Sequence, residues 1–104
     1  MLFHVTMTHT EDNCPLYHKE MIPKMIEASE HLEELGKALN VKLHYFTVCA
    51  PEHVIFGLLE ADSLSAISRY VFSLPLQQQM KIVPVENMQD TMAMAKAAMA
   101  QAQD

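Results

Sequence analysis

Polar and apolar residues alternate in the first segment of the chain. Within residues 2–8, one side of the segment carries the apolar residues Phe3, Val5 and Met7, and the residues between them are mostly polar. A period of two is typical of a half-buried β-strand. We therefore predict an opening strand whose apolar face packs on helices and whose opposite face carries His4.

The periodicity then becomes helical. A polar loop over residues 9–14 leads to Asn13 and Pro15, which suit the cap and the first turn of a helix. Apolar residues recur at helical spacing from there to about Leu39. The pattern predicts one long helix over this stretch.

Three residues modify that prediction. Pro23 lies inside the helical stretch and is expected to kink or split it, because proline lacks the backbone N–H and clashes with the preceding turn. Gly36 is expected to allow a close approach to the sheet. Asn40 is expected to end the helix in the left-handed conformation.

The rest of the chain predicts a hairpin, a second helix, a further strand and a last helix. Pro84 has no N–H for a central ladder, so its strand is expected at an edge of the sheet. The predicted elements are strands at 41–48 and 53–60, a helix from a cap at Asp62 or Ser63 to Pro75, a strand at 80–85, and a helix from a cap at Asn87 to about Gln101.

The predicted order is β-α-β-β-α-β with an extra C-terminal helix, which is the split βαβ pattern. We predict one α+β domain over residues 1–104, with a four-stranded antiparallel sheet. Both central helices then cover one face of the sheet, and the other face is bare unless something packs on it.

Charge and composition limit the classes of binding partner and the cellular location that we expect. The net charge is −6 and the chain has 7 Lys and Arg residues, so nucleic acid binding through a basic patch is excluded. No apolar run approaches the roughly 20 residues needed to cross a bilayer. The N-terminus shows no signal peptide, and two cysteines are few for a secreted disulfide scaffold. We expect a cytoplasmic protein with reduced thiols.

The chain resembles the dimeric α/β-barrel superfamily of ferredoxin-like proteins. The resemblance rests on element order over residues 1–90, on the passage 60–64 from strand into helix, and on the closing strand 82–85. Residues 6–10 followed by 13–15 resemble small bacterial proteins of this fold. The resemblance implies a homodimer whose open sheet faces pair into a barrel. The superfamily includes cofactor-free monooxygenases, isomerases, cyclases and haem-degrading enzymes, and shared fold transfers no activity.

Four residues near the N-terminus form a candidate metal site: His4, His9, Cys14 and His18. Imidazole and thiolate are ligands of zinc, copper, iron and nickel. Cys14 and His18 are four apart and share a side if a helix begins at Cys14. The alternative is a group of solvated polar residues around a loop.

Cys14 has a second possible role. A helix N-terminus stabilises a thiolate, which suits a nucleophilic or redox-sensing cysteine with His9 or His18 as its base. The alternative is a free cysteine that packs against the next turn. We interpret His53, which follows a turn, as structural, with a role as a ligand as the alternative.

His4 and His44 are the candidate catalytic pair. Both lie on predicted strands, and histidines in a sheltered cavity exchange protons near neutral pH. The alternative is a pair of hydrogen-bonded histidines in a dimer interface.

Three functions follow from these candidates. The first is a small protein that binds a transition metal or a metal-bearing cofactor through the His/Cys group. The second is a cofactor-free enzyme of isomerase, cyclase or monooxygenase type, which acts on a small apolar molecule with His4 and His44 as acid and base. The third is a structural or regulatory dimer without chemistry. The helix methionines are interpreted as core or dimer packing.

Overall fold

The computed structural model describes residues 1–75 and 78–102 of the 104-residue chain. The expected β-α-β-β-α-β order with a C-terminal helix is present. Its strands and helices are β1 (Leu2–Thr8), α1 (Ile22–Glu30), α2 (Leu32–Leu39), β2 (Lys42–Cys49), β3 (Val54–Glu60), α3 (Leu64–Val71), β4 (Gln79–Val85) and α4 (Met88–Ala102). Short 3-10 turns lie at Glu11–Asn13, Pro15–Tyr17 and Ala50–Glu52.

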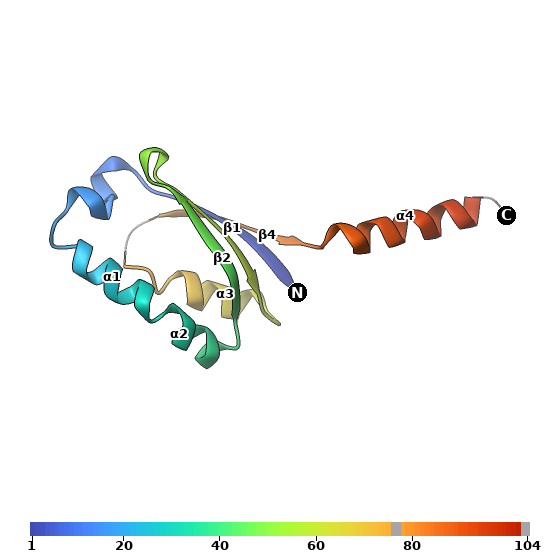
Figure 1. Ribbon diagram of the computed structural model, residues 1–104, viewed down its shortest axis with the longest axis horizontal. Coiled ribbons are helices and arrows are strands. Elements are labelled where there is room, and N and C mark those ends of the chain that lie inside the picture. The colour runs from blue at the N-terminus through green and yellow to red at the C-terminus, as the bar shows by residue number, and fades with distance from the viewer. Residues whose placement is uncertain (76–77, 103–104) are drawn as a thin grey trace.

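The four strands form one antiparallel sheet in the order β2-β3-β1-β4. Helices α1, α2 and α3 cover one face of this sheet (Figure 1). Phe3, Val5 and Met7 of β1 are buried on that face, as their alternation predicted. They pack in one core with Leu59 of β3 and with Tyr70 of α3, whose hydroxyl donates a hydrogen bond to the Leu32 carbonyl at 3.1 Å.

The prediction of a helix from Asn13–Pro15 is wrong. Residues 15–17 form a 3-10 turn, and α1 begins only at Ile22. Pro23 therefore lies in the first turn of α1 and does not kink a longer helix. Proline is favoured there because the first turn needs no backbone N–H from it. A break at His31 separates α1 from α2.

Two predictions about the end of the long helical stretch are confirmed. Asn40 has the left-handed conformation, with φ of 57°, and ends α2. Gly36 allows a close backbone approach, since a Cβ at this position would lie 2.7 Å from the Val41 carbonyl oxygen. The chain consequently passes from α2 into β2 through a short connection.

The hairpin differs from its prediction at one residue. His53 was expected to begin the third strand, but it has φ of 54° and closes the turn before Val54. Strand β2 contains an irregularity at His44, where the register to β3 shifts between Leu43 and Tyr45. Both changes alter where a histidine side chain lies.

The later elements begin close to where the sequence predicted, but α3 ends at Val71 and does not reach Pro75. Ser63 caps α3 by accepting a hydrogen bond from the Ala66 N–H at 3.2 Å. Strand β4, which contains Pro84, is at an edge of the sheet. Within residues 1–75 and 78–102, no helix combines the length and the apolar character required to cross a membrane.

Candidate metal centre

Three metal-ligating side chains meet where β1 ends and β3 begins: His9, Cys14 and His53. One ligand atom from each lies within 4.8 Å of the other two. Thr8 pairs with Val54 across the β1–β3 ladder. His9 and His53 are the next residues outward from this pair, and the His9 N–H donates to the His53 carbonyl at 3.2 Å.

Cys14 reaches the same place through the 3-10 turns. Its N–H donates to the Glu11 carbonyl at 3.2 Å, which folds residues 11–14 back towards the end of β1. The Cys14 residue is only 3% exposed. The left-handed conformation of His53 turns the chain into β3 and sets the direction of the third side chain. The cluster thus depends on two turns and one strand register.

The cluster is short of hydrogen-bond partners. Both ring nitrogens of His9 and Nδ1 of His53 are buried without a partner in the described part of the chain. The two rings meet edge to face, with centroids 5.2 Å apart, and the Tyr17 ring lies 5.8 Å from that of His53. Buried polar groups in proteins are nearly always paired, so an unpaired imidazole is an observation that calls for an explanation.

Electrostatics keep His9 neutral. Burial lowers the pKa of His9 below its usual 6.5, and the neighbouring His53 lowers that pKa further. A neutral imidazole has a free lone pair, which is the form that binds a metal. Near pH 7 the cluster therefore presents a nitrogen ligand that needs no deprotonation.

The dimensions of the cluster suit a borderline metal after a small contraction. Zinc binds nitrogen at about 2.0–2.1 Å and sulfur at about 2.3 Å, so tetrahedral ligand atoms lie roughly 3.3–3.8 Å apart. The three ligand atoms of the cluster all lie within 4.8 Å of one another. Side-chain rotations that bring these atoms to the tetrahedral separations would complete the geometry.

Two of the four residues proposed as ligands from the sequence lie elsewhere. The His18 ring bonds to the Asp12 carbonyl, and its Nδ1 is 3.8 Å from Glu20 Oε1. Its expected i,i+4 relation to Cys14 is absent because no α-helix begins there. His4 is in the middle of β1 with its ring 6.3 Å from that of Phe56. At about 3.3 Å per strand residue, it lies roughly 16 Å from His9.

His44 and His4 are on different strands with β3 between them. Adjacent strands are about 4.8 Å apart, so the two backbones are separated by roughly 10 Å. His44 Nε2 instead lies 2.9 Å from Glu60 Oε1. This hydrogen bond lowers the pKa of Glu60 below its usual 4.5, with a smaller contribution from the charge of Lys42.

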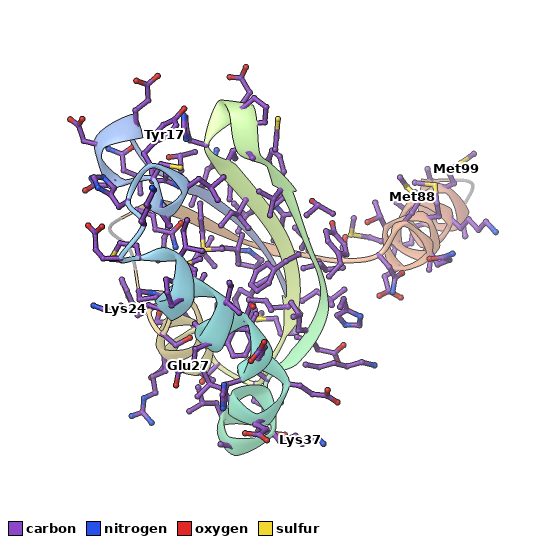
Figure 2. The ribbon with its side chains drawn as sticks, turned by 60° about the vertical axis from the view of Figure 1, so that its left-hand side comes forward. Tyr17, Lys24, Glu27, Lys37, Met88 and Met99 are labelled. Atoms are coloured by element: carbon purple, nitrogen blue, oxygen red, sulfur yellow. The ribbon has the colours of Figure 1, made fainter. Side chains whose placement is uncertain are left out.

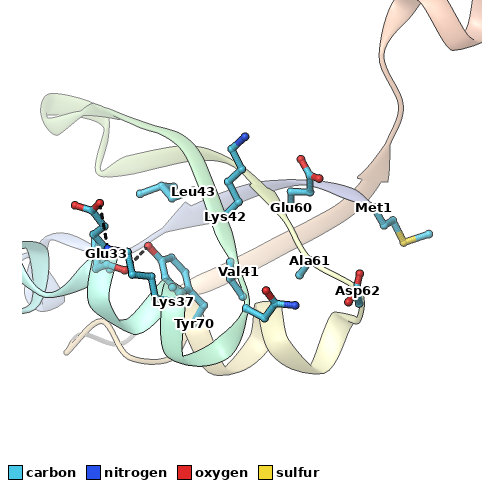
Figure 3. A pocket seen from close by; sticks show the side chains of 13 residues that line it. Met1, Glu33, Lys37, Val41, Lys42, Leu43, Glu60, Ala61, Asp62 and Tyr70 are labelled. Carbon is cyan, nitrogen blue, oxygen red and sulfur yellow. Dashed lines mark hydrogen bonds and ion pairs between the residues drawn. The ribbon is translucent and has the colours of Figure 1, made fainter.

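Two pockets flank the sheet. One, of about 620 Å³, lies between α2 and the nearby ends of β2 and β3, and Figure 3 shows that side chains of both charge signs surround it, including Lys37, Lys42 and Asp62. The other, of about 580 Å³, is next to the cluster and is lined by His9 together with uncharged residues such as Thr10 and Gln78. Chemistry at the cluster would therefore involve the second pocket.

The fold and the cluster together define a ferredoxin-like α+β protein with a partly buried group of potential metal ligands. The structure of SCO4226 from Streptomyces coelicolor A3(2) superposes with a TM-score of 0.51 at 15% identity, over 82% of this chain and 99% of that one. The de novo designed protein Ferredog-Diesel superposes with a TM-score of 0.51 at 11% identity, over 81% of this chain and 85% of its own. At these identities the likeness shows the fold alone, and it confirms the predicted ferredoxin-like α+β fold of one chain.

The chain belongs to the family described as domain of unknown function DUF3303, whose model matches residues 1–99. No curated protein matches the sequence.

Proposed function

We propose that this protein binds a transition metal, alone or as part of a cofactor, through His9, Cys14 and His53. The observation that carries the proposal is the pair of buried ring nitrogens of His9 that have no partner among the described residues, beside a buried thiol. A bound cation would pair one of these nitrogens, which otherwise remains unsatisfied at a cost of about 1–3 kcal/mol per buried polar group.

The ligand types favour borderline and soft metals. Two imidazoles and one thiolate suit zinc, copper, iron or nickel, whereas magnesium and calcium prefer oxygen ligands. Three protein ligands also leave one position of a tetrahedral site for water or a small molecule. The pocket lined by His9 supports a bound molecule at this position.

The test is metal analysis of protein purified without a histidine tag, followed by titration of the chelator-treated protein with Co²⁺. We expect near-stoichiometric metal and a thiolate-to-cobalt charge-transfer band. Cys14→Ser should abolish the band, and His53→Asn should weaken binding at least tenfold. Asparagine is chosen because it tolerates the left-handed backbone at this position.

The matched control is His18→Asn. His18 is another histidine of the same region, but its ring bonds to a backbone carbonyl outside the cluster. Its variant should bind Co²⁺ as the wild type does. Failure of the wild type to bind zinc, copper, nickel, iron or cobalt salts, or equal binding by Cys14→Ser, would refute the proposal.

A second candidate is proton transfer on the uncovered face of the sheet. The observation in its favour is the 2.9 Å contact between His44 and Glu60, since a carboxylate that bonds an imidazole orients it as an acid or a base. Neither of the two pockets described above is lined by His4 or His44. An apolar probe whose NMR shift perturbations centre on His44, and vanish in His44→Ala, would support this candidate over metal binding.

A further inference from the structure

Helix α4 is exposed along its whole length. It leaves the body of the protein at the end of β4 and points away from it (Figure 1), and none of its side chains is buried. Met88 is 69% exposed and Met99 is 65% exposed. Figure 2 shows both methionines on a helix that stands clear of the sheet and of the other helices.

The composition of α4 does not suit permanent exposure to water. Ten of its fifteen residues are alanine or methionine, and Asp90 and Lys96 are the charged ones. Met88, Met92, Ala95 and Met99 share one side at helical spacing; we call these four residues the methionine stripe. Isolated helices of about 15 residues are marginally stable in water and usually need a packed apolar side.

The start of α4 directs it away from its own sheet. The Asp90 N–H donates to Asn87 Oδ1 at 2.9 Å, and the Thr91 hydroxyl donates to Glu86 Oε1 at 2.6 Å. These bonds tie the first turn to the short connection after Val85. The helix is therefore ordered by its own cap while its methionine stripe stays exposed, with Met92 45% exposed and Met88 and Met99 more so.

The sheet face opposite the helices is also uncovered and partly apolar. Directly paired residues of neighbouring strands point to the same face. The pairing of Thr6 with Phe56, of His4 with Val83 and of Leu2 with Val85 places these three apolar residues on the uncovered face. All three are more than a third exposed. We call this surface the open face.

The exposed surface area of the protomer indicates how much surface a second molecule could cover. A compact monomer of 11.8 kDa exposes about 5,900 Å². This protomer exposes 7393 Å², an excess of about 1,500 Å². A standard protein–protein interface buries about 800 Å² per partner, so the excess is sufficient for a large dimer interface. The radius of gyration agrees, at 17.5 Å against roughly 13 Å for a compact domain of this length.

We propose that α4 is an exchanged arm: its methionine stripe packs on the open face of a second copy of this chain, and the second copy returns the same contact. In this arrangement a helix covers each open face, so the two faces do not pair directly as in the barrel that the resemblance implied. A two-fold dimer uses the same surface on both chains, so each helix covers the sheet of the other. A helix of 15 residues is about 22 Å long, which matches roughly 23 Å for a seven-residue strand. This inference does not depend on metal binding.

The first test compares two double variants of the full chain that add the same charge. Met92→Glu with Met99→Glu changes the methionine stripe. Met94→Glu with Ala97→Glu changes the opposite side of α4 and is the matched control. By light scattering and analytical ultracentrifugation we expect a dimeric wild type, a dimeric control, and at least a tenfold rise in the dimer dissociation constant for the stripe variant.

The second test locates the contact. A photo-crosslinking residue in place of Met92 is introduced into a mixture of ¹⁵N-labelled and unlabelled chains. We expect mixed-isotope crosslinks that map to the strands of the other chain. A monomeric wild type, equal effects of the two double variants, crosslinks confined to one chain, or crosslinks that map outside the sheet would each overturn the inference.

Discussion

We expect the substitution His9→Leu to stabilise the metal-free protein and to make the zinc-loaded protein less stable than the wild type. Without metal, His9 buries two ring nitrogens that find no hydrogen-bond partner in residues 1–75 and 78–102. An unsatisfied buried polar group costs about 1–3 kcal/mol. Leucine fills a similar space and has no polar atom. Because the His9 ring is only partly buried, we expect the lower end of this range, a gain of about 1 kcal/mol in the free energy of unfolding.

With zinc, the order of stabilities should be the opposite. A ligand that binds only the folded state at 100 times its dissociation constant adds about 2.7 kcal/mol. For a domain of this size that corresponds to a rise of roughly 10–20 °C in the unfolding midpoint. His9→Leu removes one of three ligands and should lose most of this gain. The wild type should then be the more stable protein by about 1–2 kcal/mol.

The assay is urea unfolding of both proteins, once with EDTA and once with excess zinc. His18→Leu is the control, since it makes the same replacement at a histidine outside the cluster. The control should show the same stabilisation by zinc as the wild type. The reasoning is refuted if His9→Leu is less stable than the wild type in EDTA and zinc stabilises both proteins equally.

Three further predictions concern titration and packing. Burial lowers the pKa of His9 below 6.5, so the metal-free wild type should lose stability as pH falls from 6.5 towards that pKa; a His9→Leu variant with the same acid dependence would contradict this. The pKa of Glu60 lies below 4.5 because His44 donates a hydrogen bond to its carboxylate. His44→Ala should therefore raise the titration midpoint of Glu60 measured by NMR. An unchanged midpoint would exclude this interaction in solution. A Cβ at Gly57 would lie 2.5 Å from the Phe46 ring, so Gly57→Ala should lower the free energy of unfolding by about 1–3 kcal/mol in urea, whereas a neutral result would show that the ring moves aside freely.

Local sequence was sufficient to predict the structure wherever one residue type restricts the backbone conformation or forms a hydrogen bond with a backbone group. The alternation in β1 indicated which side chains are buried, because a strand exposes successive residues to opposite faces. Pro84 indicated an edge strand because it lacks an N–H. Ser63 and Asn87 were recognised as caps because their side-chain oxygens accept orphan N–H groups of a helix.

Local sequence was insufficient where two positions suit the same role. Pro15 and Pro23 both fit the first turn of a helix. The structure uses the first in a 3-10 turn and the second in α1. The predicted proximity of His18 and Cys14 depended on a helix that begins at Cys14. No α-helix begins there, so the two side chains do not share a helix face.

Of the three candidate ligands, two could be found from the sequence and one only from the structure. His9 and Cys14 are close along the chain, and their residue types alone made them candidate ligands. His53 joins them only through the pairing of Thr8 with Val54, which places a distant turn beside the end of β1. Strand register is decided by which apolar faces pack into one core, so no local pattern contains it. The sequence by itself therefore indicated the order of the elements and two of the three candidate ligands, and the tertiary structure decided where the first helix begins and which histidine completes the cluster.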